Sequence, residues 1–215
     1  PPRRRCVGLS TRSCQGHSEI MNIIDHFKPK QEWGWNSLAN CVVRLVSGWR
    51  INGARAKARV VTDDLDFSNK TLILKIKGAP AVDPGFDKGF WIMLTKDGQE
   101  TGEELDLLEM MREGGNGKGR SAAISFRHKQ GIIGDMHWFD IGAFDEYTVE
   151  AVFNDTCVNV FVKSRDVFLT TFTFYIQIKT GILKAGCFAI DDKFLFKRVA
   201  DRGPLFMDLV YAELK

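Results

Sequence analysis

Three acidic residues separated by leucines have the clearest potential for chemistry in this sequence. They are Glu104, Asp106 and Glu109, in the run E-L-D-L-L-E. Successive side chains of a β-strand point to opposite faces, so Glu104 and Asp106 would share one face. Strict alternation puts Glu109 on the leucine face, whereas one extra residue, a β-bulge, returns it to the side of the other acids. With a bulge, the spacing predicts three carboxyl groups in a row on one face of a sheet.

Such a row of carboxyl groups suits the hydrolysis of a glycosidic bond with retention of configuration. That reaction needs one carboxylate as nucleophile and a carboxylic acid about 5–5.5 Å away to protonate the leaving oxygen. Clustered carboxyl groups cannot all ionise at low cost, so the pKa of one group rises and that group keeps its proton near neutral pH. The alternative for these acids is a solvated face without chemistry.

The acidic run could also be helical. Thr101 and Glu104 match a capping box, Leu105 and Leu108 fall at helical spacing, and a Gly-Gly pair follows at 114–115. A helix would place residues 104 and 109 about 140° apart around its axis, which would scatter the acids. The neighbouring segments decide between the two structures.

Those segments favour strands. They are short, contain β-branched and aromatic residues, and are separated by Gly and Asn-Asp turn signals, as in an all-β sandwich. We therefore expect a strand for the acidic run as well. Residues 19–30 allow a short helix, before Pro29. The expected strands cover residues 42–46, 57–61, 71–77, 90–94, 104–109, 122–128, 147–153, 158–163, 168–179, 187–190, 194–199 and 205–214.

Length and composition fit one compact domain. The chain has 215 residues, 44% of them hydrophobic, and 16 phenylalanines, which is enough for a sizeable core. We place a single domain at residues 21–215. Residues 1–20 are rich in Arg and are expected to form a disordered basic arm, with a transit-peptide remnant as the alternative. Because the chain begins with Pro, we expect a processed or truncated product.

The charge and the cysteines argue against several classes. The net charge is +3 and no basic face stands out beyond the first residues, so no nucleic-acid partner is expected. There is no run of about 20 apolar residues, which predicts no membrane span. The five cysteines lack C-x-x-C spacing, so no zinc site is expected, and a disulfide and free buried thiols both remain open.

The order of segments around the acidic run resembles a known family. Lys75–Pro80 and Gly89–Leu94 precede it, and Phe144–Glu150, Val158–Val162 and Met207–Ala212 follow. With the E-x-D-x-x-E run, residues 40–215 resemble glycoside hydrolase family 16, in its laminarinase-like branch. The resemblance implies a β-jelly-roll sandwich of two antiparallel sheets, similar to concanavalin A. It also implies a secreted, monomeric, endo-acting retaining β-glycosidase, without a cofactor, on a polysaccharide such as a β-1,3-glucan.

The resemblance also assigns roles in the site. Glu104 would be the nucleophile and Glu109 the general acid and base, with Asp106 hydrogen-bonded to Glu104 between them. Trp91 would stack on a sugar ring, although core packing explains a Trp equally well. His128 would line the cleft beside the acid and base, although a His before Lys129 also fits a surface position.

Further matches and departures concern the substrate. Arg55 resembles an arginine that contacts sugar hydroxyls in some members of the family. Where the family carries cleft-lining side chains, this sequence has Asp87, Lys88, Asp145 and Ala151. These departures reduce the expected sugar-stacking surface and leave the proton-transfer residues intact. Transglycosylation would differ only in the acceptor that takes the sugar.

Two other functions remain open. A lectin-like protein on the same sandwich would bind glycans without catalysis, but binding alone does not require three clustered acids. The segments 177–179 and 182–186 faintly resemble motifs of a jelly-roll alginate lyase, whose R-x-E-L-R motif is missing here. A lyase product carries an unsaturated end that absorbs ultraviolet light, which separates these two enzyme classes.

Overall fold

A computed structural model describes residues 20–30, 42–52, 58–78, 87–96, 103–111, 121–128, 133–140, 146–190 and 206–215. These ranges form antiparallel strands whose side chains alternate between a buried and a more exposed face. Strand β11 (Glu146–Phe153) shows the pattern well: Tyr147, Val149 and Phe153 are buried and the residues between them are partly exposed. This period of two is the signal of a strand with one face on a core.

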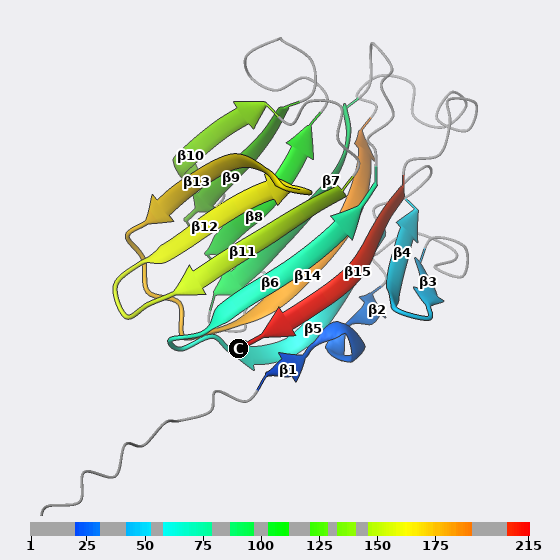
Figure 1. The fold of residues 1–215 in the computed structure, drawn as a ribbon, viewed down its shortest axis with the longest axis horizontal. Coiled ribbons are helices and arrows are strands. Elements are labelled where there is room, and N and C mark those ends of the chain that lie inside the picture. Colours follow the sequence, from blue (N-terminus) through cyan, green and yellow to red (C-terminus); the bar gives the residue numbers. More distant parts are fainter. Residues whose placement is uncertain are drawn as a thin grey trace, which may run out of the picture.

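The described strands pair into two sheets, which lie one in front of the other in Figure 1. The first sheet has the order β13 (Val167–Phe174), β12 (Val158–Ser164), β11, β6 (Thr71–Lys77), β15 (Phe206–Leu214), β4 (Gly48–Asn52) and β3 (Val42–Leu45), with β1 (Met21–Asn22) paired to β15. The second has the order β10 (Ile133–Asp140), β9 (Ser121–Arg127), β8 (Glu104–Met111), β7 (Asp87–Lys96), β14 (Thr180–Ile190), β5 (Ala58–Asp66) and β2 (Lys28–Lys30).

The core fills the space between the sheets. The acidic run lies in β8, which pairs with β7 on one side and β9 on the other. Its leucines, Leu105, Leu107 and Leu108, have no exposed surface and belong to the same core as the apolar residues of β6 and β11. The leucine face of β8 therefore fixes the strand in the sandwich, which leaves its other face for polar groups.

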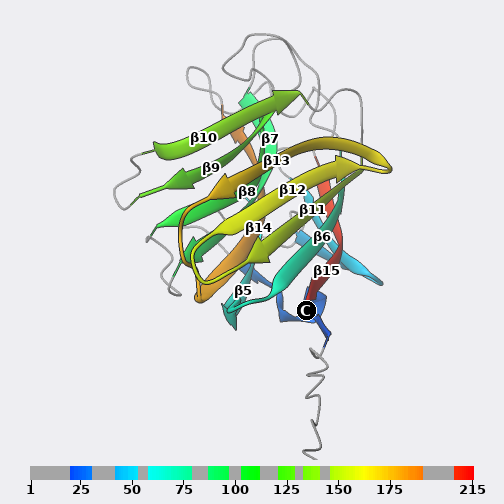
Figure 2. The same ribbon diagram turned by 60° about the vertical axis from the view of Figure 1, so that its left-hand side comes forward.

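The edge strands β10 and β13 lie at the same side of the sandwich, as Figure 2 shows. The Nε2 atom of His137 on β10 is 2.8 Å from Oγ1 of Thr170 on β13. The His137 ring also stacks on Phe172, with ring centres 5.1 Å apart. A polar contact and an aromatic contact thus join the two sheets where their backbone ladders end.

The predicted all-β sandwich is confirmed, with differences in detail. The short helix expected in residues 19–30 is wrong: β1 and β2 flank a single 3₁₀ turn, Ile24–His26. Strand β13 ends at Phe174, so the strand expected over 168–179 is too long. Strands β10 and β4 were not expected, and only the end of β14 was expected. The expected strand 194–199 and residues 1–19 of the expected arm 1–20 lie outside the described residues.

Two further expectations concern cysteines and membranes. Cys157 carries a free thiol, and its Sγ accepts hydrogen bonds from Asn154 and Asn159. In the described part of the chain, no helix has the length and apolar character needed to cross a membrane.

Leu107→Ala tests whether the extra residue of β8 belongs to the core. Since Leu107 is fully buried, we expect the free energy of unfolding to fall by about 2–5 kcal/mol. Urea denaturation measures this, with Val167→Ala on an exposed edge position as the control, expected to cost less than about 1 kcal/mol. Equal effects of the two substitutions would contradict the core position of Leu107.

Candidate active site

A β-bulge in β8 brings the three acids to one face of the second sheet. On β7, the neighbours Ile92 and Met93 pair with Leu108 and Asp106, which leaves Leu107 as the extra residue. The ladder to β9 is shifted over the same stretch, between Asp106 and Glu109. Because a bulge changes the alternation by one residue, Glu109 returns to the face of Glu104 and Asp106. The predicted bulge is confirmed, and the helical alternative is wrong.

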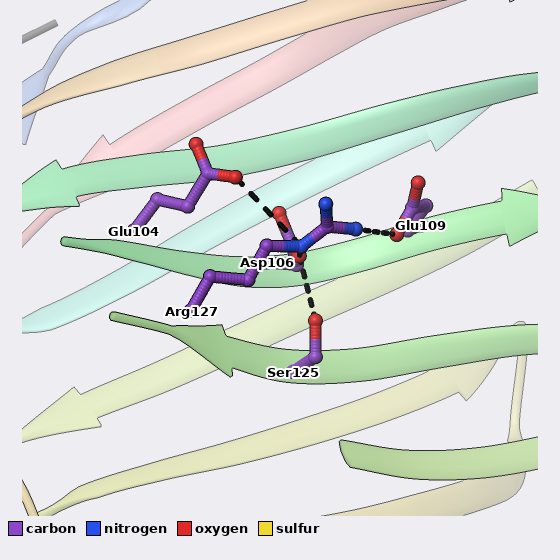
Figure 3. A network of polar contacts seen from close by, with 5 residues as sticks. All are labelled: Glu104, Asp106, Glu109, Ser125 and Arg127. Carbon is purple, nitrogen blue, oxygen red and sulfur yellow. Dashed lines mark hydrogen bonds and ion pairs between the residues drawn. The ribbon is translucent and has the colours of Figure 1, made fainter. Parts of the chain in front are cut away.

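Strand β9 adds two polar side chains to this face (Figure 3). The register pairs Ser125 with Asp106, and Arg127 with Glu104. Ser125 Oγ donates to Oδ2 of Asp106 at 2.6 Å, and Arg127 Nε donates to the same oxygen at 3.0 Å. The acids are therefore held by a neighbouring strand as well as by their own.

The Arg127 guanidinium contacts all three acids. Its Nη2 donates to Oε2 of Glu109 at 3.0 Å, and its Nε lies 3.8 Å from Oε1 of Glu104. Because one guanidinium is a small, planar group, two carboxyl groups that both contact it lie close to each other, as those of Glu104 and Glu109 do. The three acids form one compact cluster with a cation among them.

Burial and mutual repulsion shift the titration of the cluster. Asp106 has no exposed surface, and desolvation, with the charge of Glu109 next, raises its pKa to about 7. Ser125 and Arg127 act in the opposite direction on the same carboxyl. Desolvation also raises the pKa of Glu109, against the lowering effect of Arg127. Asp106 thus keeps its proton to a higher pH than an ordinary aspartate.

Two buried polar atoms on this face lack hydrogen-bond partners among the described residues. They are Oδ1 of Asp106 and Oγ1 of Thr95, and the register pairs Thr95 with Glu104. Buried polar atoms usually have partners, so each such exception needs an explanation. For Asp106, a proton on Oδ1 fits its raised pKa, because Oδ2 already accepts two hydrogen bonds.

Strand β7 places an aromatic ring beside the acids. Trp91 pairs with Glu109 in the register and is half-buried. Ile92 and Leu94 point into the core, so by alternation Trp91 shares the face of the acids. The structure therefore places Trp91 on the face of the three acids, next to Glu109.

His128 and Arg55 are the other two predicted site residues. The His128 ring packs edge-on against Phe126, with centres 5.0 Å apart, and Nδ1 lies 3.8 Å from Oε1 of Glu103. His128 follows the end of β9, and its side chain is 53% exposed. The contacts of His128 are thus with Phe126 and Glu103, and its place beside the acid and base stays a prediction. Arg55 lies outside the described residues.

Arg127 and Ser125 were missed from the sequence, although a signal was available. Ala122, Ile124 and Phe126 alternate as the apolar face of β9. Alternation then assigns Ser125 and Arg127 to the polar face, one residue away from the His128 that was chosen. The pairing partner of Asp106, however, could not be read from this pattern.

One departure from the family pattern has no effect on the site. Ala151 is fully buried on β11, in the first sheet, and faces the core. It does not belong to the face that carries the acids, so a small residue there removes no sugar-stacking surface. In the described ranges, no group of three or more His, Cys, Asp or Glu side chains is arranged to hold a metal ion.

Comparison by sequence gives no match to a protein family or to a curated protein. Comparison by structure gives many. A β-glucanase of Bacillus licheniformis is 14% identical with a TM-score of 0.60, and the match covers 94% of this chain and 99% of the glucanase. A family 16 endo-glucanase from Bacteroides ovatus, in complex with G4G3G-2F-DNP, is 14% identical with a TM-score of 0.58, over 89% and 95%.

A protein of unknown function from Saccharomyces cerevisiae has the same likeness, with 11% identity, a TM-score of 0.58, and coverage of 89% of this chain and 97% of that protein. The chain therefore has the jelly-roll sandwich fold of the family 16 glycoside hydrolases, which confirms the fold that the resemblance implied. At these identities the likeness concerns the fold, and function has to be argued from the site.

Asp106→Asn tests the buried, proton-holding carboxyl. The folded state binds a proton at Asp106 up to about pH 7, and the unfolded chain releases it near pH 4. The folded state thus binds more protons in this window, and the free energy of unfolding falls as the pH rises from about 4 to about 7. In Asp106→Asn we expect a flatter dependence and higher stability than wild type at pH 8.

Urea denaturation across this pH range measures the effect. Asp208→Asn is the control, since it removes a buried carboxylate that Arg50 binds on the other sheet, at 2.7 Å. We expect this control to lose stability while it keeps the wild-type slope between pH 4 and 7. An unchanged slope in Asp106→Asn would contradict a proton on Asp106.

Proposed function

We propose that this chain, with the fold of the family 16 glycoside hydrolases, is an endo-acting retaining β-glycoside hydrolase on a polysaccharide such as a β-1,3-glucan. The observation that carries the proposal is the bulged strand β8, which presents Glu104, Asp106 and Glu109 on one face of the second sheet. The two outer acids provide the pair of carboxyl groups that retaining hydrolysis needs.

In this proposal Glu104 attacks the anomeric carbon while Glu109 gives its proton to the glycosidic oxygen. The carbon–oxygen bond breaks and a glycosyl–Glu104 ester forms. Glu109, now ionised, takes a proton from water, whose oxygen attacks the same carbon and releases Glu104. An acceptor hydroxyl in place of water gives transglycosylation. The burial that raises the pKa of Glu109 suits the first step, because it keeps the proton available.

In this proposal Asp106 lies between the nucleophile Glu104 and the acid Glu109. When protonated, it donates a hydrogen bond from Oδ1 to the carboxyl group of Glu104 and so orients the nucleophile. The proposal thus gives the buried Oδ1 atom a partner and explains why a carboxyl group stands where an apolar side chain would be more stable.

The sugar chain would cross the strands next to the acids. The pairings place Glu109, Trp91, Gly186 and Arg59 in one row across β8, β7, β14 and β5. Trp91 offers a ring face for a pyranose beside the acid, and Gly186 has no side chain to obstruct the next position. A secreted location and a monomer stay predictions from the resemblance.

A lectin-like glycan-binding protein is the second candidate. The contact of Arg127 with all three acids favours it, because a guanidinium bound to Glu109 favours the ionised form, which cannot act as an acid. The pKa of Glu109 is nevertheless raised in the presence of Arg127, so burial outweighs the cation. Catalysis is therefore the better account of the site.

Glu104→Gln tests the hydrolase directly. We would measure the reducing ends released from β-glucans, agar, carrageenan and alginate, with ultraviolet absorbance to detect a lyase. We expect wild type to cleave one glucan or galactan, and the variant to lose about three orders of magnitude or more of that activity. Glu103→Gln, next to the site and bound to Lys96, is the matched control and is expected to keep activity.

The outcomes separate the candidates. Cleavage that survives Glu104→Gln would show that the acidic run is not the site. Binding to a glycan by both proteins, with no cleavage by wild type, would establish the lectin-like function. Product with the anomeric configuration of the substrate, observed by NMR, would support the retaining mechanism.

Trp91→Ala tests the path of the sugar chain. Loss of a stacking ring should raise KM by about tenfold, since such contacts are worth about 0.5–1.5 kcal/mol beyond buried area. Trp91→Phe keeps a ring face and should stay within about threefold of wild-type KM. A loss of stability in Trp91→Ala without any change in KM would assign Trp91 to packing alone.

A further inference from the structure

Arg127, from the neighbouring strand β9, contacts all three acids of this site. Arg127 lies opposite Glu104 in the ladder and reaches along β8 as far as Glu109 (Figure 3). Its side chain is 29% exposed, against 1% for Asp106. The arginine therefore covers the most buried acid from the outside of the sheet.

The donors of Arg127 are directed at the acids. Nε donates a hydrogen bond to Asp106 and lies near Glu104. Nη2 donates a hydrogen bond to one oxygen of Glu109, Oε2. This leaves Oε1 of Glu109 outside the contact with Arg127. A carboxyl group held by one oxygen keeps its other oxygen available to give and take a proton.

Other charged groups lie farther along the same strands. Beyond Glu104, Glu103 is bound by Lys96 on β7 and lies near His128. Asp135 lies in the shifted stretch of β10 that follows the Ile133–Arg127 pair. Lys184 of β14 lies beyond Met93 of β7, its partner in the register. Arg127 is the cation that donates hydrogen bonds to Asp106 and Glu109.

We propose that Arg127 is a positioning residue of this site: it orients Glu109 through Oε2 and supplies the positive charge that lets three acids occupy one face. This inference rests on the proposed function, and it assigns Arg127 a role toward the acids rather than toward the sugar. Removal of the charge leaves Asp106 and Glu109 with their burial and mutual repulsion alone, so both acids hold their protons to higher pH. Removal of the guanidinium also removes its hydrogen bond to Glu109, so that the Glu109 carboxyl group can rotate.

Arg127→Gln is the first test. An opposite charge at this distance lowers a carboxyl pKa by about 1–3 units, so we expect the alkaline limb of kcat/KM to move up by about one pH unit or more. We also expect kcat at the optimum to fall about tenfold, because Glu109 is less well oriented, with KM within about twofold of wild type. An unmoved alkaline limb, or a rise in KM with kcat unchanged, would overturn the proposal.

Arg127→Lys separates the charge from the geometry. Lysine keeps the positive charge but lacks the planar fork, so the alkaline limb should stay near its wild-type position while kcat remains reduced. A limb that moves as far as in Arg127→Gln would overturn the electrostatic part of the proposal. Arg50→Gln is the matched control, because Arg50 binds Asp208 through two 2.7 Å hydrogen bonds on the other sheet. It should leave kcat and the pH profile unchanged.

A second measurement does not need activity. In protein labelled with ¹³C at the Asp and Glu carboxyl groups, NMR titration reports the midpoints of Asp106 and Glu109 directly. We expect both midpoints to rise in Arg127→Gln and to stay in place in Arg50→Gln. If wild type cleaves no glycan, the hydrolase proposal fails while these midpoints still decide the role of Arg127. Midpoints that do not move would overturn it.

Discussion

One extra residue in a central strand determines what the rest of this structure can do. The side-chain period of a strand is two, so acids at positions 104, 106 and 109 reach the same face only when one residue leaves the ladder. Leu107 is that residue, and it is fully buried. The bulge therefore serves both sides of β8, since it adds a leucine to the core and returns Glu109 to the acidic face.

The register between β8 and β9 matters as much as the acidic run itself. It places Ser125 opposite Asp106 and Arg127 opposite Glu104. A slip of one residue would turn Arg127 toward the core and Phe126 toward the acids. Because this would bury a charge and expose the apolar face of β9, the slipped register is strongly disfavoured. The packing of the apolar face of β9 thus also fixes where Ser125 and Arg127 stand on the outer face.

The sequence was informative where one strand alone carries the signal. The alternation of β6 and β11 and the spacing of the three acids predicted strands, a sandwich and the bulge. It was less informative where pairing decides. Strand β10 has a shifted register and mixed polarity, and β14 contains two glycines and Lys184, so neither shows a clean period of two. Arg127 was missed for the related reason that its importance comes from the strand next to it.

Burying the acidic cluster makes the folded state less stable, and this loss of stability is an argument for the proposed catalysis. The sandwich requires only apolar side chains of suitable volume on its inner faces, so a fold shared at 14% identity says little about activity. The outer face of β8 is different, because burial raises the pKa of both Asp106 and Glu109. The proton that Asp106 holds makes the folded state less stable as the pH rises toward 7. A glycan-binding surface gains nothing from carboxyl groups that resist ionisation. A retaining hydrolase requires one such group beside an ionised neighbour, and local rules of stability are most often broken at functional sites.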